Sequence, residues 1–478
     1  MILLSTIVRP TRCLAAGVTL ALAAAVSPCR AQATPTVRPL EYRRFVLRNG
    51  LVMLLNEDRS SPIVAVDVWY HLGAKDESAG KIGFAHLCEH LMGEGSPNVN
   101  VPEKVLIQSA GGRSTFWAIT TEDITHFYYT LPSNELETAL WLESDRMAAP
   151  LTHADASHMA TVRETVRQER IQSRESPVFG LANPATIATV FPGVHPYRND
   201  PLGPMTDLDA ASPADVKTFC APFYVPNNAV VSLSGDFSTA HAKTLIEKYF
   251  GGIGRGEIPA RREIPASGLT APTRLVYEDP RANTASLRLA WPSVAFANPD
   301  RLPLVALASL LSRDRTGVLS KLLVYDRGLA TRVGAVNFDF EKGGVFQIDV
   351  FPRPGASMSA IETLLDSAVA AFSAKDIRHA DLEAFKRSNA ISAMISIETR
   401  AARADTLAHG EIFAGDPVAY AKQINTTAAL TPADIERVAR RYLGANRMVM
   451  SMIPAGKLEL ISKPELPYTR VSPAALKP

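Results

Sequence analysis

Two histidines and a glutamate lie within one short segment, His86-x-x-Glu89-His90. At about 100° per residue, an α-helix places His90 roughly 40° from His86 and Glu89 roughly 60° to the other side. All three side chains therefore share one helix face, where two imidazoles can hold one metal ion while the carboxylate reaches a water molecule beside it. Cys88, about 200° from His86, is expected to point into the core and is not counted as a ligand.

The alternative for this segment is a helix that carries two unrelated histidines. H-x-x-E-H should occur by chance in roughly one chain in a hundred of this length. Here the segment follows a strand and a turn and lies on an amphipathic helix, which favours the metal site. A catalytic zinc ion usually has three protein ligands and leaves a fourth position to water. The third ligand must therefore come from another part of the chain.

With these residues the sequence resembles the pitrilysin-like, or insulinase-type, zinc metallopeptidases, whose inverted zinc motif is H-x-x-E-H. The resemblance covers nearly all of the chain after residue 33 and depends on several short matches taken together. These are His86–Met92, Gly111-Gly112, Thr120–Asp123, Leu140–Met147, His195-Pro196-Tyr197, Pro226-Asn227-Asn228 and Gly235-Asp236-Phe237. The resemblance implies a metalloendopeptidase with a peptide substrate, one Zn²⁺ per chain and Glu89 as the catalytic base.

The resemblance also implies that a glutamate on a later helix completes the metal site. The matching segment is Arg163–Arg170, and its register gives the ligand position to Glu169. Glu164 is the rival, but it lies about 140° around the helix from Glu169, so both cannot face one metal. Four other histidines are expected to be surface or structural residues: His126, His153, His158 and His195.

Two stretches depart from the family pattern. After Gly111-Gly112 the family usually has Asn-Ala on the strand edge that pairs with substrate, but here Arg113–Ala118 is about two residues longer and has no Asn. Phe116 and Trp117 within it are either pocket walls or ordinary core residues. The substrate-binding residues at this edge are therefore not assigned.

The second departure concerns an Arg and, seven residues later, a Tyr, which bind substrate and the oxyanion in single-chain family members. Val324 and Thr331 occupy those two positions here, and neither side chain can replace a guanidinium or a phenol. Because some family members are heterodimers, we predict the zinc-bearing subunit of such a pair, with a homologous partner that supplies Arg and Tyr. Tyr325 or Arg327 could substitute locally. A non-catalytic scaffold subunit is the other alternative, although such subunits usually lose part of the zinc motif.

Internal similarity shows how the chain is organised. Ser212-Pro213 and Thr431-Pro432 each open a helix that is followed by an apolar strand, at an offset of 219 residues. Glu57-Asp58 and Glu278-Asp279 each precede an alternating strand, at an offset of 221 residues. Two matches at one period indicate duplication. We expect a zinc-bearing peptidase domain at 34–255, a linker at 256–269 and a second homologous domain without the motif at 270–478.

Within each half, strands and helices segregate instead of alternating strictly. Phe45–Asn56, with an Asn-Gly turn, and Ile63–His71 predict antiparallel strands. Helices are expected over 82–93, 102–110, 133–147 and 153–175. The fold class is therefore α+β, with two duplicated domains that each pack helices on a mainly antiparallel sheet.

The first 33 residues have the order of a secretory signal peptide. Arg9 and Arg12 precede an apolar run of 14 residues, and Ala31-Gln32-Ala33 fits the cleavage pattern. A membrane anchor would need roughly 20 apolar residues, and lipidation at Cys29 is disfavoured by the preceding proline. No later stretch could span a membrane after cleavage. We expect a secreted protein, located in the periplasm of a Gram-negative bacterium.

Composition excludes several other classes. Hydrophobic residues make up 46% and charged residues 21% of the chain, as in ordinary globular proteins. Removing residues 1–33 takes away three arginines and no acids, which changes the formal charge from +2 to −1 and disfavours nucleic acid as a partner. Only Cys88 and Cys220 then remain. They could form one disulfide, but two buried free thiols are expected.

Overall fold

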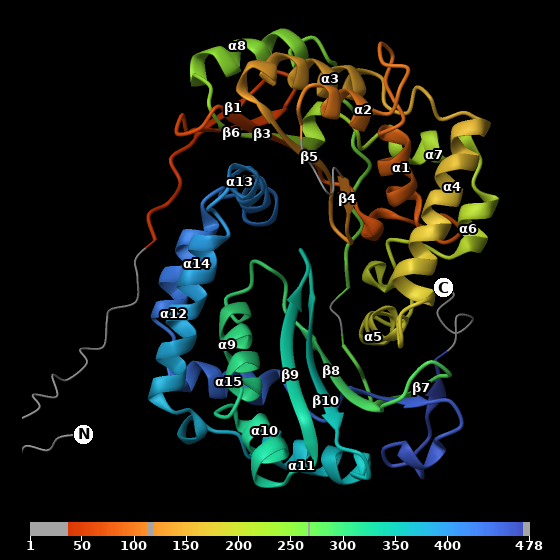
Figure 1. The fold of residues 1–478 in the computed structure, drawn as a ribbon, viewed down its shortest axis with the longest axis vertical. Coiled ribbons are helices and arrows are strands. Elements are labelled where there is room, and N and C mark those ends of the chain that lie inside the picture. Colours follow the sequence, from red (N-terminus) through yellow and green to blue (C-terminus); the bar gives the residue numbers. More distant parts are fainter. Residues whose placement is uncertain (1–36, 113–117, 266–267, 472–478) are drawn as a thin grey trace, which may run out of the picture. The chain divides into compact units, whose positions relative to one another are not determined.

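Two six-stranded sheets form the framework of the protein (Figure 1). The computed structural model describes residues 37–112, 118–265 and 268–471. The first sheet has the order β1-β2-β6-β3-β5-β4, in which only β2 and β6 are parallel. Its strands are β1 (Arg43–Val46), β2 (Val52–Glu57), β3 (Ile63–Tyr70), β4 (Ala118–Thr120), β5 (Thr125–Pro132) and β6 (Ala229–Gly235).

The second sheet repeats this arrangement with strands from later in the chain, except that its edge strand β12 is parallel to β7, whereas β1 is antiparallel to β2. Its order is β12-β7-β11-β8-β10-β9, and the parallel β7–β11 pair takes the place of β2–β6. The strands are β7 (Thr273–Asp279), β8 (Ser286–Ser293), β9 (Ala330–Asp339), β10 (Gly344–Pro352), β11 (Met448–Pro454) and β12 (Thr469–Arg470). The predicted α+β fold, with two duplicated and mainly antiparallel sheets, is confirmed.

Helices pack on both sheets and bury two large apolar cores. In the first half they are α1 (Phe84–Met92), α2 (Glu103–Ser109), α3 (Leu136–Ala148), α4 (Ala156–Arg170), α5 (Ala182–Val190), α6 (Met205–Ala210), α7 (Pro213–Cys220) and α8 (Thr239–Phe250). In the second half they are α9 (Arg301–Ser312), α10 (Val318–Ser320), α11 (Met358–Ala371), α12 (His379–Ile395), α13 (Arg400–Ala414), α14 (Ala419–Ala428) and α15 (Pro432–Tyr442). Among the described residues, no helix is both long and apolar enough to cross a membrane.

The duplicated helix starts carry the same local chemistry. The Ser212 and Thr431 hydroxyls accept hydrogen bonds from the backbone N–H groups of Asp215 and Asp434. In return, the two aspartate carboxylates accept hydrogen bonds from the backbone N–H groups of Ser212 and Thr431. Each pair is a capping box that fixes the first turn of α7 or α15. The repeat found in the sequence thus corresponds to equivalent helices, which precede the equivalent strands β6 and β11.

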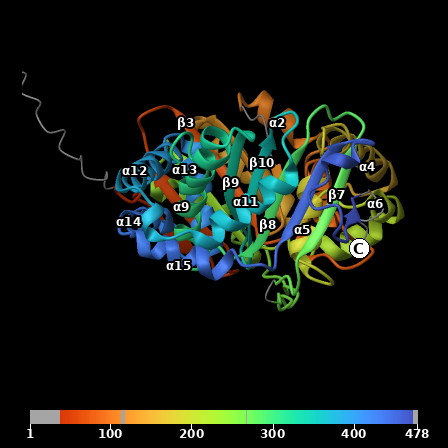
Figure 2. The ribbon, with the colours of Figure 1, turned by 90° about the horizontal axis from the view of Figure 1, so that it is seen from below.

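Each sheet is also covered by a helix from the other half of the chain. Helix α13 packs against β6 and β3 of the first sheet (Figure 1). Helix α5 packs against β8 and β11 of the second sheet, and Figure 2 shows α5 next to β8. Leu407 and Ala408 of α13 are fully buried in a cluster with Leu54 and Trp69. Each half of the chain therefore contributes one helix to the sheet of the other half. The domain limits at 255 and 270 remain a prediction.

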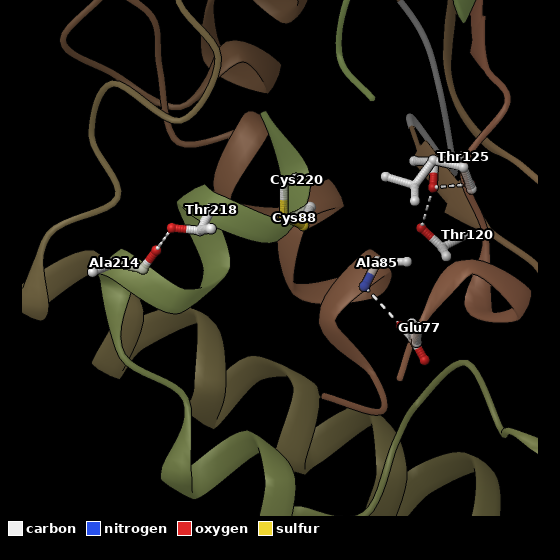
Figure 3. Close-up of a disulfide and its surroundings, with 9 residues drawn as sticks. Glu77, Ala85, Cys88, Thr120, Thr125, Ala214, Thr218 and Cys220 are labelled. Atoms are coloured by element: carbon white, nitrogen blue, oxygen red, sulfur yellow. Dashed lines mark hydrogen bonds between the residues drawn. A yellow bond between two sulfur atoms is a disulfide. The ribbon is translucent and has the colours of Figure 1, made fainter. Parts of the chain in front are cut away.

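The two cysteines form a disulfide between α1 and α7 (Figure 3). Their Cα atoms lie 6.2 Å apart, within the range that a disulfide requires. The expectation of two free thiols is therefore wrong. Helix geometry correctly predicts that Cys88 points into the core, but the sequence does not show that Cys220, 132 residues later, faces it there.

Candidate metal centre

Helix α1 is fixed at its start by a buried carboxylate. Gly83 precedes the helix with a φ of 92°, and a side chain there would meet the backbone of Gly203. The backbone N–H groups of Gly83 and Ala85 donate to Glu77 at 2.9 and 2.8 Å, and Figure 3 shows the second of these bonds. Burial raises the pKa of Glu77 well above its usual range, although the two N–H groups act in the opposite direction. Together with the disulfide, this cap holds α1 in one position.

The ends of three side chains meet where α1 packs against α4. Nε2 of His86 and Nε2 of His90 lie 3.2 Å apart. Oε2 of Glu169, on α4, lies 3.4 Å from the first nitrogen and 3.5 Å from the second. Ligand atoms of a tetrahedral zinc ion, each about 2.0–2.1 Å from the metal, are separated by roughly 3.3–3.4 Å. The three atoms therefore form a triangle of the size that one zinc ion needs.

The rival glutamate lies outside this triangle. Glu164 is exposed on α4, where it accepts a hydrogen bond from Gln168 at 2.7 Å and pairs with Arg167 at 3.3 Å. One turn and a half of helix separates it from Glu169, so the two carboxylates face different directions, as the helix geometry predicts.

Glu89 lies beside the triangle. Its carboxylate is within 4.8 Å of the ligand atoms of His86 and His90, and the residue is only 6% exposed. Burial raises its pKa, while His90 and a hydrogen bond with Thr120 of β4 lower it. Within the described chain, Oε2 of Glu89 has no hydrogen-bond partner. A buried carboxylate oxygen without a partner is available to a water molecule bound at the same place.

The titration of the three candidate ligands follows from burial and from their mutual contacts. Burial and the neighbouring His90 lower the pKa of His86 to about 3, which leaves the neutral imidazole that a metal requires. Burial also lowers the pKa of His90, but Glu169 and Glu89 outweigh it and the net shift is upward. The pKa of Glu169 is lowered overall, because its contacts with both histidines outweigh burial. The donor set of two imidazoles and one carboxylate fits zinc.

Two protein-family models match this chain. The model described as Insulinase (Peptidase family M16) matches residues 52–186, which include all four residues of the candidate centre, and the model described as Peptidase M16 inactive domain matches residues 210–389. The chain belongs to the pitrilysin-like insulinase family. The fold and the resemblance seen in the sequence agree with this assignment.

Relatives of this family member are named as zinc proteases. The zinc protease PqqE of Helicobacter pylori is 25% identical over 72% of this chain and 78% of its own length. The uncharacterized zinc protease YmxG of Bacillus subtilis is 21% identical over 87% of this chain and 99% of its own. A crystal structure of a protease from Helicobacter pylori shares the fold with a TM-score of 0.77 at 22% identity, covering 87% of this chain and 100% of that one. The first half of the periplasmic protease PqqL from Escherichia coli has a TM-score of 0.73 at 16% identity, covering 92% of this chain and 96% of that one.

Val324 and Thr331, the two residues singled out in the second half, make contacts of other kinds. Val324 is partly buried against the second core, and the Thr331 hydroxyl donates to the carbonyl of Phe351 at 3.1 Å. Two residues could substitute for them. The Tyr325 hydroxyl donates a hydrogen bond to Asp314, and Arg327 is the residue that follows a π-helical turn, Lys321–Asp326. Phe116 and Trp117, named as pocket walls or core residues, lie outside the described residues.

Of the four other histidines singled out in the sequence, three make hydrogen bonds to protein groups. His153 contacts the carbonyl of Ser96 at 3.1 Å, His158 contacts Asp155 at 3.0 Å, and His195 contacts the carbonyl of Pro265 at 3.1 Å. His126 differs, because it is buried against Asp67 at 3.0 Å and close to Asp405 of α13. The sequence gives no sign of this cluster, since its members are spread over 338 residues.

Proposed function

We propose that this family member is a zinc-dependent endopeptidase, with His86, His90 and Glu169 holding one catalytic Zn²⁺ and Glu89 acting as catalytic base. The observation that carries the proposal is the triangle of ligand atoms with edges of 3.2, 3.4 and 3.5 Å. The names of the relatives, zinc proteases, support the same activity.

The side chains around the centre define the reaction. When bound, zinc supplies a Lewis acid for a carbonyl oxygen and lowers the pKa of water. Glu89 takes the proton from the attacking water and passes it to the nitrogen of the leaving amine. His86 and His90 would hold the metal as neutral imidazoles and would therefore not move this proton. Because Glu89 is buried, few bulk water molecules compete for its carboxylate.

The strand β4 offers a place for an extended peptide. It is one of the two edge strands of the first sheet as described, paired on one side with β5, and its last residue, Thr120, hydrogen-bonds to Glu89. An edge strand has backbone N–H and C=O groups that can pair with an added strand. A peptide bound in this way would run next to the catalytic base.

We also propose that the active enzyme is a heterodimer in which this chain is the zinc-bearing subunit. Val324 and Thr331 stand where single-chain relatives have Arg and Tyr, and Thr331 already donates to the backbone. A homologous partner subunit that carries the Arg and the Tyr would complete the site. Export through the signal peptide at 1–33, to the periplasm, agrees with the disulfide between Cys88 and Cys220, since disulfides persist in oxidising compartments.

The decisive experiment measures peptide cleavage and zinc content on the same preparations. Glu89→Gln should keep its zinc and lose cleavage, while His86→Ala should lose both. Glu164→Gln, which removes an equal charge from the exposed side of α4, is the matched control and should retain both. Undiminished cleavage by Glu89→Gln would overturn the assignment of the base.

The subunit proposal has its own test. The complex isolated through a tag on residues 34–478 should cleave unfolded peptides, whereas the purified chain alone should bind zinc and cleave them far more slowly. Full activity of the chain alone would refute the heterodimer, and zinc binding without cleavage in any preparation would favour the scaffold alternative.

A further inference from the structure

A second group of metal-ligand side chains lies beneath α13. Asp67 of β3, His126 of β5 and Asp405 of α13 each place one possible ligand atom within 4.8 Å of the other two. The group shares no residue with the centre formed by His86, His90 and Glu169. Asp67 and His126 are 2% and 6% exposed and form the buried side of the group, and Asp405 is its most exposed member.

The strand register explains why two of the residues meet. Trp69 of β3 pairs with His126 of β5, so Asp67, two residues before Trp69, is a diagonal neighbour of His126 on the same face of the sheet. Nδ1 of His126 lies 3.0 Å from Oδ1 of Asp67. The imidazole ring is also stacked on Tyr128, which fixes its plane.

The third residue is brought to this face by packing between the halves. Leu407 and Ala408 of α13 are buried against the sheet, next to Asp405 in the helix. At the start of the helix, Arg400 and Arg403 both pair with Asp58, which follows β2. These contacts hold Asp405 against the sheet, 338 residues away from Asp67 in the sequence.

The charges of the cluster do not balance. The contact between His126 and Asp67 can neutralise one carboxylate only. In the part of the chain that the structure describes, no hydrogen bond or ion pair reaches the carboxylate of Asp405. His409, one helical turn later, adds no charge at neutral pH, because burial lowers its pKa to about 4. Burial and the nearby Asp67 raise the pKa of Asp405 to about 7, as expected for a carboxyl group that lacks a compensating charge.

We propose that Asp67, His126 and Asp405 bind a second divalent cation, for which Zn²⁺ is the first candidate. One imidazole and two carboxylates are a common ligand set for zinc, and a charge of +2 offsets both carboxylates. The cation would join α13 of the second half to β3 and β5 of the first sheet. Its role is structural, because none of its ligands belongs to the catalytic centre.

The test separates the two sites by removing the catalytic one. The variant His86→Ala/His90→Ala of residues 34–478 is dialysed against Zn²⁺ alone, and bound zinc is measured by elemental analysis. It should retain one equivalent and should melt at a higher temperature with Zn²⁺ than with chelator. Adding Asp405→Asn should abolish both the remaining equivalent and the zinc-dependent rise in melting temperature.

A matched control removes a similar charge nearby. Glu398 is exposed just before α13, so Glu398→Gln in the same background should keep the zinc and the thermal shift. Absence of zinc from the His86→Ala/His90→Ala variant, with no thermal response to Zn²⁺, would overturn the proposal and indicate that a proton shared between the carboxylates stabilises the cluster. Zinc that is retained after Asp405→Asn would also overturn it. Neither result depends on peptidase activity, so failure here leaves the proposed catalytic function intact.

Discussion

Replacing Lys75 by methionine should destabilise the protein strongly, although the residue is not one of the candidate ligands or the candidate base. Lys75 is 6% exposed, and its ammonium lies 3.2 Å from Asp123 and 3.2 Å from Glu341, with a further bond to the carbonyl of Asp123 at 2.7 Å. Glu341 belongs to the turn between β9 and β10, so the ammonium joins the first half of the chain to the second.

The size of the effect follows from what the substitution leaves behind. Removing one partner from a buried ion pair typically costs about 3–5 kcal/mol, because a charge remains without compensation. Asp123 keeps a hydrogen bond from Tyr197 at 2.7 Å, and Glu341 keeps His71 at 2.7 Å. We therefore expect Lys75→Met to lower the free energy of unfolding by about 3 kcal/mol at pH 7, the lower end of that range.

The stability difference between the wild type and Lys75→Met should depend on pH. Contacts with His71 and Lys75 outweigh burial and lower the pKa of Glu341 well below its usual range. A carboxylate with a lowered folded pKa stabilises the protein above its unfolded pKa, and this stabilisation is lost as the pH falls towards the folded value. The difference between wild type and Lys75→Met should thus be complete at pH 7 and shrink below about pH 4.5.

Urea unfolding followed by tryptophan fluorescence and circular dichroism measures both effects. In the double variant Lys75→Met/Glu341→Gln, the carboxylate that would be left without its cation is itself removed, so part of the lost stability should return. A loss below about 1 kcal/mol for Lys75→Met, or strictly additive losses in the double variant, would refute the assignment of Lys75 as the cation of this cluster.

Two further predictions concern other cross-links in the fold. Cys88→Ser removes a disulfide that closes a loop of 132 residues, for which the chain-entropy estimate of the stabilisation is about 5 kcal/mol. The melting temperature of this variant should therefore fall to that of the reduced wild type. An unchanged melting temperature would show that the disulfide does not form. Glu362 is 1% exposed and binds Arg274 through two bonds of 2.9 and 2.7 Å, and these contacts outweigh burial and lower its pKa from 4.5 to about 2. This carboxylate should add about 3 kcal/mol to the free energy of unfolding above pH 4.5, and this stabilisation should be lost as the pH falls towards 2. In Glu362→Gln the free energy of unfolding should therefore fall less over this pH range than in the wild type. The same pH dependence in both proteins would contradict the prediction.

Local sequence patterns predict the features that depend on neighbours in the chain. The period of the helix places His86, Glu89 and His90 on one face, the cap residues Ser212 and Thr431 begin their helices, and the duplication predicts two similar sheets. The helix face and the caps are local, because helix periodicity and capping act over one or two turns, whereas the two sheets follow from a repeat of about 219 residues.

Features that depend on distant packing could not be predicted in the same way. Asp405 reaches Asp67 only because α13 packs across the first sheet, and Cys220 reaches Cys88 only because α7 packs on α1. No periodic pattern in the sequence specifies which helix covers which sheet. The position of Glu169 was given by family resemblance, and the spacing along α4 served only to exclude Glu164 from the same face.

Because α13 of the second half covers the first sheet, residues 34–255 alone should not form this sheet in its native state. Without α13, the side chains of Leu54, Trp69 and Val230, at most 5% exposed in the whole chain, would face water. Each such side chain loses roughly 1.5–3 kcal/mol when it is exposed, which together is comparable to the whole stability of a typical domain. The fragment should therefore bind 1-anilinonaphthalene-8-sulfonate and show no cooperative unfolding, although it contains every residue of the proposed catalytic centre. Adding residues 270–478 as a separate chain should restore cooperative unfolding if α13 supplies the missing cover. A fragment that unfolds cooperatively by itself would show that the first sheet is stable without α13.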